Sequence, residues 1–279
     1  MAVALERITR EIESLPTLPE VYTTVSRMLE NPKVSASDIA EVISRDPAIT
    51  AKLLKIVNSA FYGLPQQVST LTHALVLLGF STVKSLLLAT SLTQVFGKAG
   101  TDRFDRPAFW THCFATGLVA KSIAIRIGYV KVEEMFIQGL LHDIGKIVLD
   151  QYAPDEFAAV LAAAEEERIL LREAEERLLG FDHSEVGALV AKRWNFPPHF
   201  AHSIGRHHRP RTADRLLQEA SMVHLADIVC RAKQIGYGGD PCIPALSALA
   251  WKALNLDWKA FVVVMEEAGA LEEGADVFQ

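Results

Sequence analysis

The sequence predicts an all-α fold built as a two-lobe helical bundle. Apolar residues recur at helical spacing along the 279-residue chain, and the alternating pattern of strands is almost absent. A polar, glycine-containing stretch at 97–106 separates two sets of predicted helices. We therefore expect an N-terminal helical lobe at residues 1–100, a second lobe at 101–235 and a C-terminal helical extension at 236–279.

The first lobe is expected to contain about five helices. One follows the proline-containing segment 15–19 and ends near Leu29, before Asn31-Pro32. Another starts at Ser35–Asp38, and a third starts where Asp46 can cap a helix that has Pro47 at its first position. The remaining two are predicted at 70–78 and 81–96, separated by Gly79.

The second lobe and the extension also show helical periodicity. Two charged segments, 165–167 and 173–177, are interpreted as solvated helix faces. The expected helices are 107–127, 132–152, one starting at Pro154, 183–194, one from Pro197-Pro198 to near His208, 213–235, 244–254 and 258–272.

Composition limits the classes of partner and the compartment. The chain is 50% hydrophobic and 22% charged with a formal net charge of −6, which argues against general affinity for nucleic acid or anionic membranes. Its cysteines (Cys113, Cys230 and Cys242) are odd in number and form no metal motif, as expected of a reduced protein. The segment 1–10 lacks a signal-peptide core, and no apolar run reaches the roughly 18–20 residues that span a bilayer. We expect a cytoplasmic protein with neither a membrane nor a nucleic-acid partner.

The segment Gly139–Lys146 places His142 and Asp143 side by side in an otherwise apolar run. Either group costs stability when it is buried without a partner. Imidazole and carboxylate are also ligands that suit divalent transition metals. The pair must therefore be satisfied by a metal or by other side chains.

Other histidines and an aspartate on different predicted helices are candidates to join this pair. Taken singly, each has a structural explanation: His112 as a core residue, His183 beside a helix cap, and Asp227 paired with His224 on one helix face. The tandem histidines could simply lie at the negative end of a helix dipole. Taken together they predict a metal site of the kind built between facing helices. The full set is His112, His142, Asp143, His183, His207, His208 and Asp227.

This set of nitrogen and oxygen ligands, without a thiolate, suits iron or manganese at least as well as zinc. It could hold one octahedral ion with ligands to spare, or two ions bridged by Asp143. Two ions about 3.5–4 Å apart suit phosphoester hydrolysis. Asp143 and Lys146 are then the catalytic candidates, because Lys146 could neutralise phosphate charge; the alternatives for Lys146 are a salt bridge to Asp143 or a surface position.

The order of these residues resembles that of the HD superfamily of metal-dependent phosphohydrolases. The H…HD…D order is carried by His112, His142-Asp143 and Asp227. The residues His183 and His207-His208 correspond to the additional ligands of its two-metal members, which include the HD-GYP cyclic-dinucleotide hydrolases. The resemblance departs from HD-GYP in two places: Arg209-Pro210-Arg211 replaces a Gly-Tyr-Pro signature, and Ala108 stands where some members have a carboxylate.

A wider resemblance, covering roughly residues 12–235, is to the HDOD domain. It is carried by Leu15–Pro19, Ile43–Thr50, Val57–Gly63, Ala74–Gly79, Gly139–Lys146 and Phe181–His183. It implies a bacterial signalling or regulatory protein whose second lobe is HD-like and whose N-terminal lobe binds a signalling partner. No output or receiver domain is expected in 236–279.

Three hypotheses follow. The first is an HDOD signalling protein whose HD-like lobe binds one or two divalent ions (iron or manganese, with zinc as an alternative) for regulation or ligand sensing. The second is an active phosphohydrolase acting on a nucleotide or other phosphoester. The third, a DNA-binding regulator, rests only on short helices in the first lobe and is disfavoured by the net charge.

Overall fold

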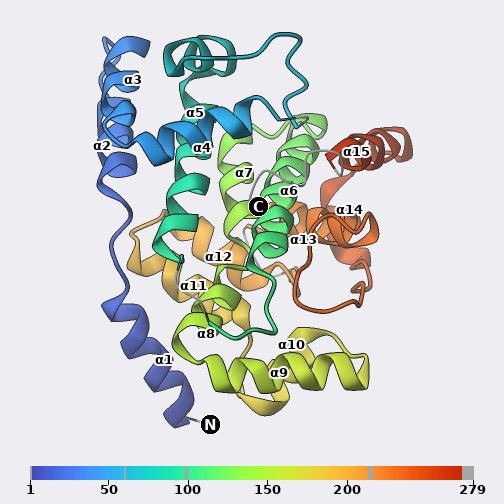
Figure 1. Cartoon of the computed structure of the whole chain (residues 1–279). Helices are drawn as coiled ribbons and strands as arrows, with labels where there is room; N and C mark the ends of the chain where they lie inside the picture. The colour runs from blue at the N-terminus through green and yellow to red at the C-terminus, as the bar shows by residue number, and fades with distance from the viewer. Residues whose placement is uncertain (1, 60, 98–99, 213–215, 272–279) are drawn as a thin grey trace. The chain divides into compact units, whose positions relative to one another are not determined.

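The computed structural model describes residues 2–59, 61–97, 100–212 and 216–271 (Figure 1). Within these ranges the regular structure is helical, with no strand, so the predicted all-α class is confirmed. The chain divides into two compact units: an N-terminal unit, Pro16–Gly97, and a larger unit made of Met1–Leu15 and Lys98–Gln279.

The N-terminal unit contains four helices among its described residues: α2 (Glu20–Met28), α3 (Ala36–Ser44), α4 (Pro47–Val57) and α5 (Leu71–Val95). Local sequence explains two of the starts. Ser35 forms a capping box with Asp38 at the start of α3. Asp46 accepts a hydrogen bond from the backbone amide of Ile49 at the start of α4, which has proline in its first turn.

The predicted separation of 70–78 from 81–96 is present as a kink inside α5. Gly79 has φ 79° and ψ 160°, outside the helical region. A positive φ is accessible to glycine without the steric cost that a side chain would add. The two helical segments therefore change direction at this residue.

The larger unit carries the order of elements that the sequence predicted, with one addition. Its helices are α1 (Ala2–Ser14), α6 (Arg106–Arg126), α7 (Val132–Leu141), α8 (Ile144–Tyr152), α9 (Pro154–Glu167), α10 (Leu171–Leu178), α11 (His183–Arg193), α12 (Pro198–Arg206), α13 (Leu217–Ala232), α14 (Ala248–Leu254) and α15 (Trp258–Leu271). The helix α1 was not expected. It packs on α8 and α11 and buries Ile8 and Ile12. The expected helix start at 213 and the expected helix end at 272 lie outside the described residues.

The single helix expected at 132–152 is wrong, because the chain breaks at His142-Asp143. The helix α7 ends at Leu141 and α8 begins at Ile144, and Asp143 has φ −101° and ψ 9°. Adjacent residues of a continuous helix point about 100° apart. The break lets the two adjacent polar side chains face the same interior site.

A pair of glycines brings α6 and α7 together, and Figure 1 shows these helices side by side. A Cβ on Gly139 would lie 2.7 Å from the Cα of Gly117, and a Cβ on Gly117 would lie 2.7 Å from the carbonyl oxygen of Phe136. The backbones therefore pack closer than larger residues allow. This approach places the ring of His112 on α6 with its centroid 5.3 Å from that of His142.

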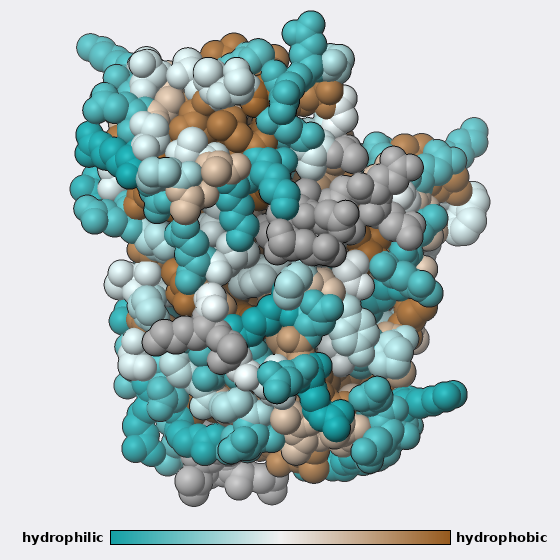
Figure 2. All heavy atoms as spheres, viewed as in Figure 1, coloured by the Kyte–Doolittle hydropathy of each residue, from teal (hydrophilic) through white to brown (hydrophobic). Residues whose placement is uncertain are grey.

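Two helices, α5 and α6, are long and apolar enough to cross a membrane by length and composition, contrary to the sequence expectation. In their most apolar windows, 56% and 72% of the residues are buried. Core helices of globular proteins meet the same criterion, so this is weak evidence for a membrane span. Figure 2 shows a visible face with mixed hydrophilic and hydrophobic areas.

Candidate metal centre

The larger unit brings all seven predicted ligand residues together. Six of them are at most 1% exposed and His208 is partly buried. They come from α6 (His112), the α7–α8 junction (His142 and Asp143), the start of α11 (His183), the end of α12 (His207 and His208) and α13 (Asp227).

The carboxylate of Asp143 lies at the centre and divides the histidines into two groups. Its Oδ2 is 3.2 Å from Nε2 of His142 and 3.8 Å from Nε2 of His112. Its Oδ1 is 3.1 Å from Nε2 of His183 and 3.7 Å from Nε2 of His207. The candidate ligand atoms within each group lie within 4.8 Å of one another.

We name these groups the first and second half-sites. The first half-site is His112, His142, Asp143 and Asp227, and the second is Asp143, His183, His207 and His208. Asp227 belongs to the first because its Oδ1 is 3.1 Å from Nε2 of His112 and 3.8 Å from Nε2 of His142. The predicted bridging position of Asp143 therefore has a geometric basis.

Several polar atoms that face the interior of the site are better suited to bind a metal than to hydrogen-bond to one another. Nε2 of His112, His142 and His207 and Oδ1 of Asp143 are buried without a hydrogen-bond partner. A buried polar atom left unsatisfied costs about 1–3 kcal/mol. Two ligands at right angles on an ion with bonds of about 2.1 Å lie about 3 Å apart, close to the shorter separations here. A divalent ion in each half-site would satisfy these atoms.

The outer nitrogens of the histidine rings are held by other groups. Nδ1 of His142 lies 2.7 Å from the carbonyl oxygen of Gly139, and Nδ1 of His207 lies 2.7 Å from that of Ile204. A ring nitrogen that donates to a carbonyl leaves the opposite nitrogen available to a metal. These contacts therefore aim Nε2 of both rings at Asp143.

Glu175 performs the same role for His183 and was missed by the sequence. Its Oε2 lies 2.6 Å from Nδ1 of His183 and also accepts the backbone amide of His183. The segment 173–177 was interpreted as a solvated face, but Glu175 is fully buried on the inner side of α10 with Leu171 and Ala174. That interpretation is wrong at this residue.

The charges of the site are strongly coupled. Burial opposes ionisation of Asp143, but His142 and Lys146 outweigh it and hold the pKa of this carboxyl well below its usual range. Burial also opposes charge on His142, but Asp143 raises its pKa to about 9. In His183 burial is likewise outweighed, chiefly by Glu175, and the pKa is raised to about 9. Burial and the neighbouring His142 lower the pKa of His207 to about 3. A metal must therefore displace protons from His142 and His183.

Lys146 is fully buried and bonded within the site. Its Nζ donates to Oδ2 of Asp143 at 2.6 Å and to the carbonyl oxygen of Gly238 at 2.7 Å. The salt bridge that the sequence allowed as an alternative is thus present. The predicted catalytic role of Asp143 and Lys146 toward a phosphate stays a prediction.

A loop after α13 covers the first half-site. A Cβ on Gly238 would lie 3.5 Å from Nε2 of His112. Arg231 bonds Asp227 at 2.9 Å and Asp240 at 3.1 Å, which connects the loop to a candidate ligand. Neither Arg231 nor Asp240 was identified from sequence, although Arg231 lies four residues after Asp227 on one helix, at a spacing that favours ion pairs.

The pair between Asp227 and His224, which the sequence allowed as an alternative to metal binding, is not formed. Nδ1 of His224 lies 2.7 Å from the carbonyl oxygen of His207, and its Nε2 accepts the backbone amide of Ser247. Both ring nitrogens of His224 are therefore engaged outside the site. Asp227 instead faces His112 and Arg231.

Comparisons with known proteins agree with this architecture. The family model of the HDOD domain matches residues 15–210. An HDOD domain protein of unknown function from Geobacter sulfurreducens has a crystal structure with a TM-score of 0.81 and 27% identity, covering 97% of this chain and 96% of that one. A candidate phosphohydrolase from Shewanella amazonensis SB2B is 25% identical with a TM-score of 0.71, covering 97% of this chain and 98% of that one. An uncharacterized protein of Treponema pallidum is 29% identical over 226 residues, which are 80% of this chain and 44% of that protein. The chain thus spans less than half the length of the Treponema relative.

Proposed function

This chain belongs to the HDOD domain family, and we propose that it is a bacterial, cytoplasmic signalling protein whose larger unit holds divalent metal for regulation rather than for turnover. The observation that carries the proposal is the engagement of Lys146 beside the first half-site. Lys146, the cation beside the bridging Asp143, is bonded to that carboxylate and to the covering loop at Gly238. A substrate phosphate would have to displace these contacts before it reached the ions.

We propose that the centre holds two ions, of iron or manganese, with zinc as the alternative. The support is the shared carboxylate of Asp143 between two groups of buried nitrogen and oxygen ligands. Such ions would stabilise the folded chain, since they bind a site that the unfolded chain lacks.

The N-terminal unit is proposed to bind a signalling protein. Two large apolar side chains on α5, Val76 and Leu77, are 70% and 50% exposed. Neighbouring apolar side chains in such positions are suited to contact another protein. Replacing both with serine should abolish partner capture by this unit while leaving the metal content unchanged.

A second candidate function, phosphoester hydrolysis, is favoured by the same bridging geometry. Two ions there would supply an activated water and a clamp for the transferring phosphoryl group. The test is a panel of nucleotides and phosphoesters offered to the metal-loaded chain. Our proposal expects no turnover in the ordinary enzymatic range, which begins at about 1 s⁻¹; a specific substrate hydrolysed at such a rate would replace it with the hydrolase.

A further inference from the structure

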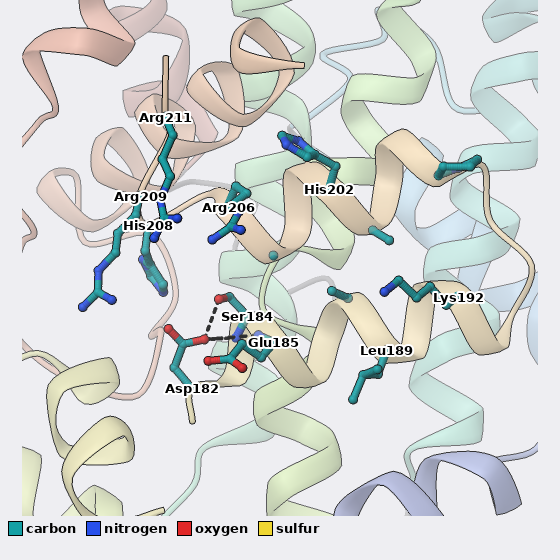
Figure 3. A pocket seen from close by; sticks show the side chains of 14 residues that line it. Asp182, Ser184, Glu185, Leu189, Lys192, His202, Arg206, His208, Arg209 and Arg211 are labelled. Carbon is teal, nitrogen blue, oxygen red and sulfur yellow. Dashed lines mark hydrogen bonds between the residues drawn. The ribbon is translucent and has the colours of Figure 1, made fainter. Parts of the chain in front are cut away.

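A groove of about 700 Å³ runs between α11 and α12, next to the second half-site. Figure 3 shows Arg206, Arg209 and Arg211 gathered at one end of it, with Lys192 on α11 toward the other. His208 lines the groove and is also a member of the second half-site, where its Nε2 lies 2.8 Å from that of His183.

Small residues set the spacing of the two helices beneath the groove. A Cβ on Gly205 of α12 would lie 3.2 Å from the Cβ of Ala188 on α11. A Cβ on Gly187 would lie 2.8 Å from a methyl group of Ile204. The helices therefore pack closely and form the floor of the groove, while His208, Arg209 and Arg211 line it from the segment after α12.

The charge lining the groove is predominantly positive, on a chain whose formal net charge is −6. Two carboxylates also line it. Asp182 accepts the backbone amides of Ser184 and Glu185 as the N-cap of α11, while Glu185 is exposed and lies in the field of Arg206.

The basic side chains that line the groove differ in whether they form ion pairs. Arg209 is paired with Glu176 at 2.7 Å on the surface. Among the residues that the structure describes, no ion pair engages Lys192, Arg206 or Arg211. These three cations are therefore available to an anionic ligand.

The wall beside the cations is apolar, with Leu189, Pro198 and Ala201 contributing to it. Small-molecule sites in proteins have volumes of roughly 300–1,000 Å³ and combine apolar walls with a few charged groups. Arginine is well suited to phosphate because its planar donors can engage two oxygens at once.

We propose that this groove binds a nucleotide, with its phosphates on Arg206 and Arg211 and its base against the wall at Leu189. The proposal goes beyond the metal centre and does not require ions to be bound. Because His208 borders both sites, the ligand would lie beside the second half-site, where a signalling protein could register it.

The test is isothermal titration calorimetry of the whole chain with ATP, GTP and inorganic pyrophosphate, in EDTA so that bridging metal is absent. We expect at least one nucleotide to bind with a stoichiometry of one and pyrophosphate to bind more weakly. The double variant Arg206→Ala/Arg211→Ala should weaken nucleotide binding at least about tenfold, because it removes two charge-assisted contacts. The control Arg103→Ala, an exposed arginine paired with Glu165 outside the groove, should bind as the parent chain does.

A second variant tests the contribution of the apolar wall to binding separately from that of the cations. Leu189→Ala should weaken nucleotide binding several-fold, because it removes an apolar contact with the base. The affinity for pyrophosphate, which has no base, should not change. The proposal is overturned if neither nucleotide binds saturably at millimolar concentration, if pyrophosphate binds as tightly as the nucleotides, or if the double variant binds as the control does. Metal content, measured on separate samples prepared without EDTA, decides the proposed function independently.

Discussion

The two half-sites share Asp143 but differ in how they are enclosed. In the first, Asp227 is bonded to Arg231, and the loop at Gly238 lies over His112. In the second, His208 is only partly buried and borders a groove. His112 also borders a cavity, of about 380 Å³, but its side chain is only 1% exposed. An ion in the first half-site should therefore exchange more slowly than an ion in the second, which could respond to a ligand in the groove. This difference suits a regulatory centre in which one ion supports the fold and the other reports on the groove.

The largest effect is expected from Asp143→Ala, which removes the group common to both half-sites. Metal content should fall to near zero. The variant also leaves Lys146 buried without its carboxylate, and loss of one partner of a buried pair costs about 3–5 kcal/mol of unfolding free energy. Elemental analysis and urea denaturation in chelator measure the two effects separately. The control Asp102→Ala, at an exposed position, should change neither, and unchanged metal content in Asp143→Ala would show that the pair is only structural.

A matched pair of histidine variants tests whether the half-sites are separate. His112→Ala should remove the ion of the first half-site, and His208→Ala should remove the ion of the second. Each variant lacks one ligand of a single half-site and keeps all ligands of the other. Each variant should retain about one ion per chain by elemental analysis, given the two-ion proposal. If either variant loses all metal, the site is a single cluster rather than two separate half-sites.

Glu175→Gln changes a supporting contact of the second half-site without removing a ligand. The carboxylate of Glu175 orients His183, and loss of such a supporting contact typically weakens metal affinity by about 10–100-fold. Titration with a competing chelator should show weaker binding of one ion and unchanged binding of the other. Equal weakening of both ions would show that the half-sites are not independent.

The pH dependence of metal affinity should be of the order of tenfold per pH unit at each half-site. The pKa values of His142 and His183 are both raised to about 9, by Asp143 and by Glu175 respectively, in each case against the effect of burial. Protons occupy both rings below that pH, so affinity should rise as pH increases from 6 to 9 and fall on acidification. Dye-monitored proton release on addition of manganese measures this, and a pH-independent affinity would contradict it.

The sequence predicted the helical class, the helix start at Ser35–Asp38, the cap at Asp46 and the break at Gly79 because each depends on local residue chemistry. It also identified the seven residues that the structure brings together. It missed the break at His142-Asp143, since helix-forming apolar residues flank that junction and no proline marks it. Asp143 occupies the N-cap position of α8, but its side chain makes no cap hydrogen bond.

The supporting contacts were harder to predict because they join residues distant in sequence. Glu175 lies within a run of charges typical of exposed helix faces, and only the packing of α10 shows that it is buried. The contact of Lys146 with Gly238 depends on the course of an irregular loop. Periodicity carries no information about either contact.

The two-ion centre bridged by Asp143 can be measured without any substitution. The measurement is elemental analysis of the chain purified without chelator. We expect about two ions of iron, manganese or zinc per chain, and a melting temperature that falls when EDTA removes them. A chain without stoichiometric transition metal, with melting unaffected by EDTA, would contradict it.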